Sequence, residues 1–235
     1  MVTENRKRPE RERVQPWFEG IRTTVLGDPN FPTDLGSVPK APVRLWYRGE
    51  LLPSDSEGVG IVGSRSCSTA GTRRSARLGR ELAAEGVTVV SGLAKGIDGA
   101  AHRGALHGGG RTVAVLGTGL RHVYPYEHRE LGEAVAESGA LVSQFNDPGF
   151  SGYRNGRNFL QRNVVIASFS RVLVVVEAKK RSGSLSTVRA ALAQGKPVGL
   201  LRSLVDSEKW ASDLSRSPGV FVVDSTADVL ERLVF

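Results

Sequence analysis

Two buried strands that each end at a glycine, followed by a polar and cationic turn, constrain this chain more than any other feature. The first runs through Val59–Val62 into Gly63-Ser64-Arg65, and the second ends at Ser91 and continues from Gly92 to Asp98. Each turn opens a helical stretch, so free backbone amides at the helix start can attract an anion. Glycine lets the backbone approach such a ligand closely. The pair predicts a site for a phosphorylated ligand, either a nucleotide or the backbone of a nucleic acid.

From Val59 onward, short apolar runs alternate with helical stretches. The runs expected as strands are residues 60–62, 88–90, 112–116, 141–142, 172–176, 198–201 and 220–223, and the expected helices are 72–85, 97–106, 127–137, 159–168, 185–194, 207–214 and 226–233. Continuous apolar strands between helices are typical of a parallel sheet covered on both faces. With right-handed crossovers this predicts an α/β fold, a doubly wound, mostly parallel sheet with helices on both faces in an extended Rossmann-like arrangement.

The chain before Val59 differs in composition from the rest. Residues 1–20 form a basic, arginine-rich tail that we expect to be disordered. In residues 21–58, prolines at positions 32, 39 and 42 predict an extended lead-in that packs on the edge of the domain through Trp46 and Tyr47. Residues 59–235 then form the Rossmann-like domain.

Charge and cysteine content narrow the class of protein. The 235 residues carry 32 basic and 24 acidic side chains, a formal net charge of +8. A basic domain favours polyanionic partners, although solubility alone is the competing explanation. The single cysteine, Cys67, excludes an intramolecular disulfide and a zinc site built on several thiolates. No apolar run is long enough to span a membrane and the charged start lacks the apolar core of a signal peptide, so we expect a cytoplasmic protein.

Polar glycine turns follow the strand ends along the predicted sheet, and ligands bind beyond the carboxyl ends of strands in such folds. We expect ligand contacts from these turns and from the basic side chains beside them. The set is Gly63, Ser64, Arg65, Ser91, Gly92, Lys95, Gly96, Gly117, Gly119, Arg162, Lys179, Ser182, Gly183 and Ser184. Asp98 stands near a helix start, where a carboxylate stabilises free amides, so we assign Asp98 and His102 to a structural network rather than to catalysis.

Several cofactor motifs are missing from the sequence. The first turn does not match Gly-x-Gly-x-x-Gly, no acidic residue follows the second strand to hold a ribose, and there is no P-loop. We therefore expect no cofactor. The four histidines, at positions 102, 107, 122 and 128, do not form a ligand pattern, so we predict no metal. Tyr124, Tyr126 and Tyr153 are candidates for stacking on nucleobases.

The chain resembles the DprA/Smf family of DNA-processing proteins through several motifs in the same order. The most specific is Ser91-Gly92-Leu93-Ala94-x-Gly96-Ile97-Asp98-x-x-Ala101-His102. The others are Gly63-Ser64-Arg65, the run from Thr112 to Gly119 with Tyr124-Pro125, the pair Arg162-Asn163, and the run from Glu177 to Thr187. The resemblance spans residues 31–203.

This resemblance implies a non-catalytic protein of the bacterial cytoplasm that binds single-stranded DNA as a homodimer, without a membrane partner. Members of the family protect incoming strands and load the RecA recombinase during natural transformation, so RecA is an expected partner. Carried over to this chain, Arg65, Lys95 and Arg162 hold phosphates, while Asn163 and the Ser182-Gly183-Ser184 turn shape the rim. Residues 59–235 are then the DNA-binding domain.

Val164 departs from the family pattern, which has a second arginine at this position, and we expect a reduced or divergent member without accessory domains. Two other functions stay open. One is nucleotide hydrolysis of the kind found in lysine-decarboxylase-like LOG phosphoribohydrolases, whose phosphate turn carries a catalytic glutamate. Here Arg189 stands near that position, which disfavours hydrolysis. The other is a nucleotide-sensing module.

Overall fold

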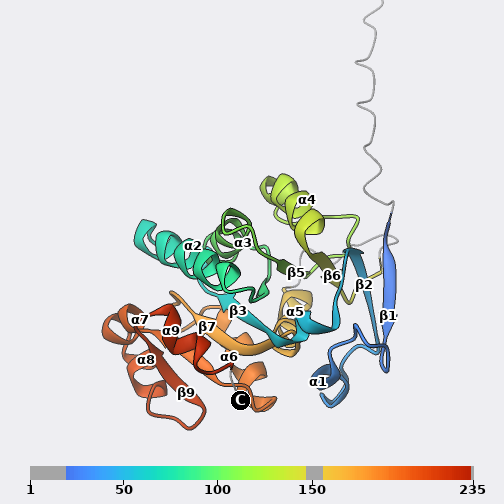
Figure 1. The fold of residues 1–235 in the computed structure, drawn as a ribbon. Coiled ribbons are helices and arrows are strands. Elements are labelled where there is room, and N and C mark those ends of the chain that lie inside the picture. The colour runs from blue at the N-terminus through green and yellow to red at the C-terminus, as the bar shows by residue number, and fades with distance from the viewer. Residues whose placement is uncertain (1–19, 147–155, 234–235) are drawn as a thin grey trace, which may run out of the picture.

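A single mixed sheet organises the molecule. The computed structural model describes residues 20–146 and 156–233, so the predicted tail lies outside the described residues except for Gly20. Within these ranges, nine strands form one sheet in the order β1-β2-β6-β5-β4-β3-β7-β8-β9 (Figure 1). Its parallel strands are β3 (Gly58–Val62), β4 (Val89–Ser91), β5 (Thr112–Leu116), β6 (Ala140–Ser143), β7 (Ser170–Val175), β8 (Val198–Leu201) and β9 (Val220–Val223). The predicted doubly wound, mostly parallel sheet is confirmed.

Helices cover both faces of this sheet. One face carries α2 (Thr69–Ala84), α3 (Ile97–His107), α4 (Arg129–Ser138) and α9 (Thr226–Leu230). The other carries α1 (Thr33–Gly36), α5 (Arg157–Ser168), α6 (Ser184–Ala193), α7 (Arg202–Ser207) and α8 (Lys209–Leu214). Because successive strand residues point to opposite faces, β7 supplies both cores: Val174 lies in the core on the face of α2 and α3, and Val175 in the core on the face of α5 and α6.

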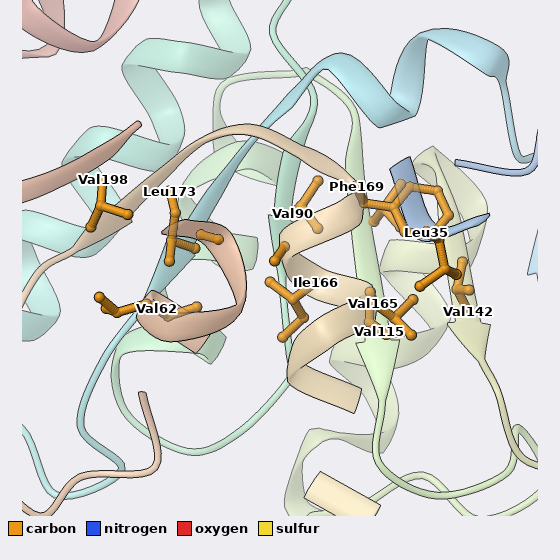
Figure 2. Close-up of a cluster of buried hydrophobic side chains, with 14 of the residues drawn as sticks. Leu35, Val62, Val90, Val115, Val142, Val165, Ile166, Phe169, Leu173 and Val198 are labelled. Atoms are coloured by element: carbon orange, nitrogen blue, oxygen red, sulfur yellow. The ribbon is translucent and has the colours of Figure 1, made fainter. Parts of the chain in front are cut away.

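The core beneath α5 fixes the position of that helix over the sheet. Val165 and Ile166 of α5, and Phe169 just after its end, are almost fully buried among side chains such as Val90 and Leu173 from the strands (Figure 2). Each side chain buried to this extent stabilises the fold by about 1.5–3 kcal/mol. The N-terminal turn of α5 is thereby held at the carboxyl edge of the sheet.

The chain order creates a switch point between β3 and β7. From β3 the chain winds through β4, β5 and β6 to one side, and it then returns to β7 and winds through β8 and β9 to the other. The helices that follow β3 and β7 therefore lie on opposite faces, which leaves a crevice above the carboxyl ends of these two strands. Ligands of doubly wound folds bind in this crevice.

Two features differ from the expected elements. The predicted helix over residues 207–214 is divided between α7 and α8, because Glu208 takes an extended conformation with ψ 113°. Residues 21–58, for which no strand was predicted, contain β1 (Arg22–Val25) and β2 (Arg44–Gly49). These strands pair antiparallel with each other and with β6, so Trp46 and Tyr47 belong to the sheet itself.

Candidate functional site

A cleft of about 480 Å³ opens at the switch point. Its walls come from the turn after β3, the start of α3, and the first turns of α5 and α6. The polar and glycine residues that line it include Gly63, Ser64, Arg65, Ser66, Asp98, Tyr124, Arg162, Asn163, Ser182, Gly183 and Ser184. A smaller pocket, lined by Gly92 and Lys95 among others, adjoins the cleft and shares Arg65 and Arg162 with it. The sequence-predicted turns after β3, β4 and β7 thus meet in one place.

The turn after β3 places an exposed cation in the cleft. The Ser64 amide donates to the Glu177 carbonyl over 2.7 Å, which ties this turn to the end of β7. A Cβ on Gly63 would lie 2.6 Å from Ile97 Cγ1, so a larger residue would displace the turn. The Arg65 guanidinium lies 5.0 Å from the centre of the Phe159 ring. Arg65 forms no ion pair with any described residue, so its charge is available to an anion.

The turn after β4 packs directly against the turn after β3. Gly96 has a φ of 76°, and a Cβ there would overlap the Ser64 carbonyl oxygen, so glycine is required on both counts. Lys95 is exposed at the rim and donates to Glu127 Oε1 over 2.6 Å. This hydrogen bond raises the pKa of Lys95 and lowers the pKa of Glu127. Both side chains are more than half exposed, so solvent and salt weaken the pair.

Arg162 lines the same cleft but is held from within the protein. Its side chain is only 4% exposed, and Nη1 donates to the carbonyls of Gly92 and Val115, each over 2.6 Å. A Cβ on Gly92 would overlap the guanidinium, so this glycine provides the space for Arg162. Burial lowers the pKa of Arg162 to about 10, which still leaves it protonated at neutral pH. Arg162 therefore joins the ends of β4 and β5 to α5.

Asp98 lines the cleft at the start of α3, and His102 lies one turn further along the same helix; both side chains are buried. Burial raises the pKa of Asp98, against the opposing charge of Arg162 and hydrogen bonds from the Ala94 and Gly92 amides. Thr112 donates to the Val89 carbonyl over 2.7 Å, so His102 Nδ1 must donate to Thr112 Oγ1, also over 2.7 Å. Burial lowers the pKa of His102 to about 3, and the ring is neutral at physiological pH.

The turn that opens α6 forms the opposite wall of the cleft. Ser182 Oγ and Ser184 Oγ lie 2.6 Å apart, and the Asn163 amide donates to Ser186 Oγ over 2.6 Å and to the Gly183 carbonyl over 3.3 Å. These bonds fix the turn against α5. The first turn of α6 contains no acidic residue, so the positive end of its helix dipole faces the cleft without an opposing charge from that turn.

Some predicted residues lie apart from the cleft lining. Ser91 is fully buried and donates to the Ile61 carbonyl over 2.6 Å. Gly117 and Gly119 are buried, and Gly117 packs against the Phe159 ring. Lys179 is exposed and lines a neighbouring groove together with Glu177. The stacking candidate Tyr124 lines the cleft, whereas Tyr126 is 73% exposed away from it and Tyr153 lies outside the described residues.

Phe159 is a site residue that the sequence reasoning did not select. It lines the cleft beside Tyr124, with 5.8 Å between the ring centres, and it carries Arg65 over its face. Its position three residues before Arg162 places both side chains on one face of α5. The helical spacing between Phe159 and Arg162 is the feature of the sequence from which Phe159 could have been predicted as a site residue.

Within the described ranges, no group of three or more histidine, cysteine, aspartate or glutamate side chains could hold a metal ion. None of the helices in the part of the chain that the structure describes is long and apolar enough to cross a membrane.

A doubly wound sheet with a cleft at its switch point is the architecture of Rossmann-like proteins, whose ligands bind at this place. The family model described as DNA recombination-mediator protein A matches residues 22–233, and the chain belongs to this family of DNA-processing proteins. The predicted DprA/Smf membership is thereby confirmed.

Named relatives agree with this assignment. Protein Smf of Synechocystis is 42% identical over 168 residues, which cover 70% of this chain and 42% of that protein. DNA processing protein DprA of Streptococcus pneumoniae is 37% identical over 219 residues, 93% of this chain and 76% of that protein. The chain thus spans less than half of the first relative and about three quarters of the second.

Solved structures give the same fold. The X-ray structure of DprA from S. pneumoniae superimposes with a TM-score of 0.79 and 34% identity, covering 93% of this chain and 76% of that one. DNA processing protein A of Helicobacter pylori, which is described with a single-stranded DNA binding mode, superimposes with a TM-score of 0.76. Its 23% identity, over 91% of this chain and 96% of that one, supports the fold alone.

Proposed function

We propose that the cleft binds the sugar-phosphate backbone of single-stranded DNA. The observation that carries this proposal is Arg65, an exposed cation without an acidic partner among the described residues, held over an aromatic ring inside the cleft. A cation beside an aromatic surface suits a strand whose phosphates and unpaired bases are both accessible. The net charge of +8 and membership of the DNA recombination-mediator family support the same ligand.

Each part of the cleft has a role in this proposal. Arg65 and Lys95 contact phosphates, and the Ser182-Gly183-Ser184 turn at the start of α6 shapes the opposite rim. Phe159 and Tyr124 offer faces for stacking, worth about 1–3 kcal/mol per base without sequence preference. Arg162 acts mainly by holding the floor of the cleft. Binding is therefore electrostatic, tolerant of sequence and steeply dependent on salt.

Because the chain belongs to this family, the proposal also includes the two protein partners expected from the sequence. These are a second copy of the chain and the RecA recombinase, in a cytoplasmic role in DNA uptake and transformation. The DNA-binding domain of this proposal is residues 59–235. Catalysis is not part of it: Asp98 is the one carboxylate among the described residues that line the cleft, and backbone amides hold it.

Fluorescence anisotropy with a labelled oligodeoxythymidylate, across a series of salt concentrations, tests the proposal. The double variant Arg65→Ala, Lys95→Ala should lose most of its affinity, and the slope of log K against log salt should fall by about 0.7 for each phosphate that the variant no longer neutralises. Arg80→Ala is the matched control, because Arg80 is exposed near the end of α2 remote from the cleft. An unchanged affinity in the double variant would remove the site assignment, and release of free base from a nucleoside monophosphate would favour the hydrolytic alternative.

A further inference from the structure

The turn after β4 contains a residue in a strained conformation. Leu93 has a φ of 56°, a left-handed conformation that costs energy for a residue with a Cβ atom. Its side chain is fully buried in the same core as Leu131 and Val135 of α4, so packing holds the side chain in place. A backbone conformation of this kind persists only where the surrounding structure fixes it. The hydrogen bonds to the main chain of this turn therefore decide its shape.

Three successive carbonyls of the turn accept hydrogen bonds from three different elements. The Gly92 carbonyl accepts from Arg162 of α5 over 2.6 Å, and the Ala94 carbonyl accepts from a main-chain amide of α3 over 3.0 Å. The Leu93 carbonyl between them lies 2.8 Å from His128 Nδ1. A carbonyl oxygen has no proton to donate, so Nδ1 carries the hydrogen of this bond. His128 thus supplies the bond at the strained residue itself.

The same short helix contacts the turn at a second point. His128 ends the 3₁₀ helix η2 (Tyr126–His128), and its neighbour Glu127 accepts from Lys95 over 2.6 Å. Glu127 and Lys95 are both more than half exposed, so water and ions weaken their pair. His128 is only 6% exposed, and a hydrogen bond shielded from water is electrostatically stronger. The buried bond from His128 therefore fixes the turn more firmly than the exposed pair does.

The imidazole ring of His128 is enclosed by α3. A Cβ on Gly99 would lie 2.5 Å from the ring atom Cε1, so glycine at this position leaves room for the ring. A ring enclosed in this way keeps its Nδ1–H directed at the Leu93 carbonyl.

We propose that His128 is a positioning residue of the cleft, which keeps the turn after β4 in its strained form and thereby places Lys95 at the rim. The inference rests on the single-stranded DNA binding proposed above. Among the described residues that line the cleft and the adjoining pocket, Lys95 is present and His128 is not, so His128 acts on a bound strand only through the turn. Without this bond the Leu93 carbonyl is buried without its donor, and the turn relaxes to satisfy it.

Two substitutions of the same shape isolate the hydrogen bond. Asparagine and leucine side chains have nearly the same outline, but only asparagine can donate an N–H from the place of Nδ1. In anisotropy titrations with a labelled oligodeoxythymidylate at low salt, His128→Leu should bind about three- to fivefold more weakly than the wild type, and His128→Asn should bind within about twofold of it. His107→Leu is the matched control, because it removes a histidine-to-carbonyl hydrogen bond at an exposed position of α3 and should bind like the wild type.

A second measurement separates positioning from a general loss of stability. In a Lys95→Ala background, the difference in affinity between His128→Leu and His128→Asn should disappear, because the side chain that the turn places is no longer there. A loss of folded protein would weaken binding by the same factor in both backgrounds. Thermal melting of each variant confirms that the titrations are made on folded protein. If His128→Leu does not fold, His128→Ala takes its place, since alanine also lacks the donor.

The outcomes also separate this inference from the function on which it rests. Absence of oligonucleotide binding by the wild-type protein contradicts the proposed function itself. Normal binding by the wild type with equal affinities of the folded His128→Asn and His128→Leu proteins overturns the positioning role alone. A difference between these two variants that stays the same in the Lys95→Ala background likewise overturns it, because His128 would then act on the strand by a route other than Lys95.

Discussion

Two arginines line the same cleft in opposite environments. Arg65 is exposed on the Phe159 ring, whereas Arg162 is 4% exposed and donates to two main-chain carbonyls. Both follow from the sequence as candidate phosphate ligands, and the same residue type nevertheless does different work in the two places. The exposed arginine forms no ion pair with a described residue, and the buried one donates to main-chain carbonyls at the strand ends. Location in the fold, more than charge, decides which role an arginine takes.

The largest expected effect comes from removing the buried arginine. Arg162→Met should lower the free energy of unfolding by about 2–6 kcal/mol, because it leaves the buried carbonyls of Gly92 and Val115 without their donor, at about 1–3 kcal/mol each. Arg65→Met should change stability by no more than about 0.5 kcal/mol while weakening oligonucleotide binding. Urea denaturation of the two variants, followed by tryptophan fluorescence, measures the contrast. Arg162→Lys keeps the charge but not the forked guanidinium, so its stability should fall between those of Arg162→Met and Arg65→Met. Equal stability of the two methionine variants would contradict the structural role of Arg162.

A second expected effect concerns the neutral histidine of the buried network. The pKa of His102 is about 3 in the folded protein, below its ordinary value of 6.5. The group therefore contributes stability that is complete above pH 6.5 and is lost as the pH falls toward 3. The loss amounts to about 1.4 kcal/mol per pH unit, or about 2 kcal/mol at pH 5.

His102→Asn should remove this part of the acid sensitivity, since the asparagine amide can still donate to Thr112. Urea denaturation at pH 7.5 and pH 5.0 measures it. His107→Asn is the matched control, because His107 is exposed on the same helix. If both variants lose stability with acid as steeply as the wild type, His102 does not contribute to the acid sensitivity of the fold.

Much of the fold could be predicted because the strands of the central sheet are buried on both faces. Their continuous apolar runs, such as Thr112–Leu116, are distinctive, and the glycine turns mark where they end. The antiparallel edge was not predicted. β1 has only four residues, two of them exposed threonine and arginine, and its pairing with β2 is set by contacts distant in the sequence.

The candidate site could be predicted less completely, for a physical reason. Turns after strands are local features, so Gly63-Ser64-Arg65 and Gly96 could be recognised from sequence alone. The burial of Arg162 depends on the space left by Gly92, seventy residues away. The exposure of Phe159 likewise depends on how α5 meets the turn after β3. The burial of Arg162 and the exposure of Phe159 thus depend on contacts between elements that are distant in the sequence, and such contacts could not be predicted from one sequence.

The smallest expected effect lies at the rim of the cleft, where Lys95 is an exposed cation that already has an acidic partner. Lys95 resembles Arg65 in exposure, but its ammonium group is shared with Glu127. Glu127→Gln should free Lys95 and strengthen oligonucleotide binding a few-fold at low salt, whereas Lys95→Ala should weaken it a few-fold, and neither should change stability. Anisotropy titrations of both single variants and the double variant measure the coupling. Because an exposed pair is screened by ions, both effects should vanish as salt rises, while the stability effect of Arg162 should persist. Two results would contradict this contrast between buried and exposed cations. One is a stability loss in Arg162→Met that varies with salt, and the other is a change in binding at Lys95 that does not.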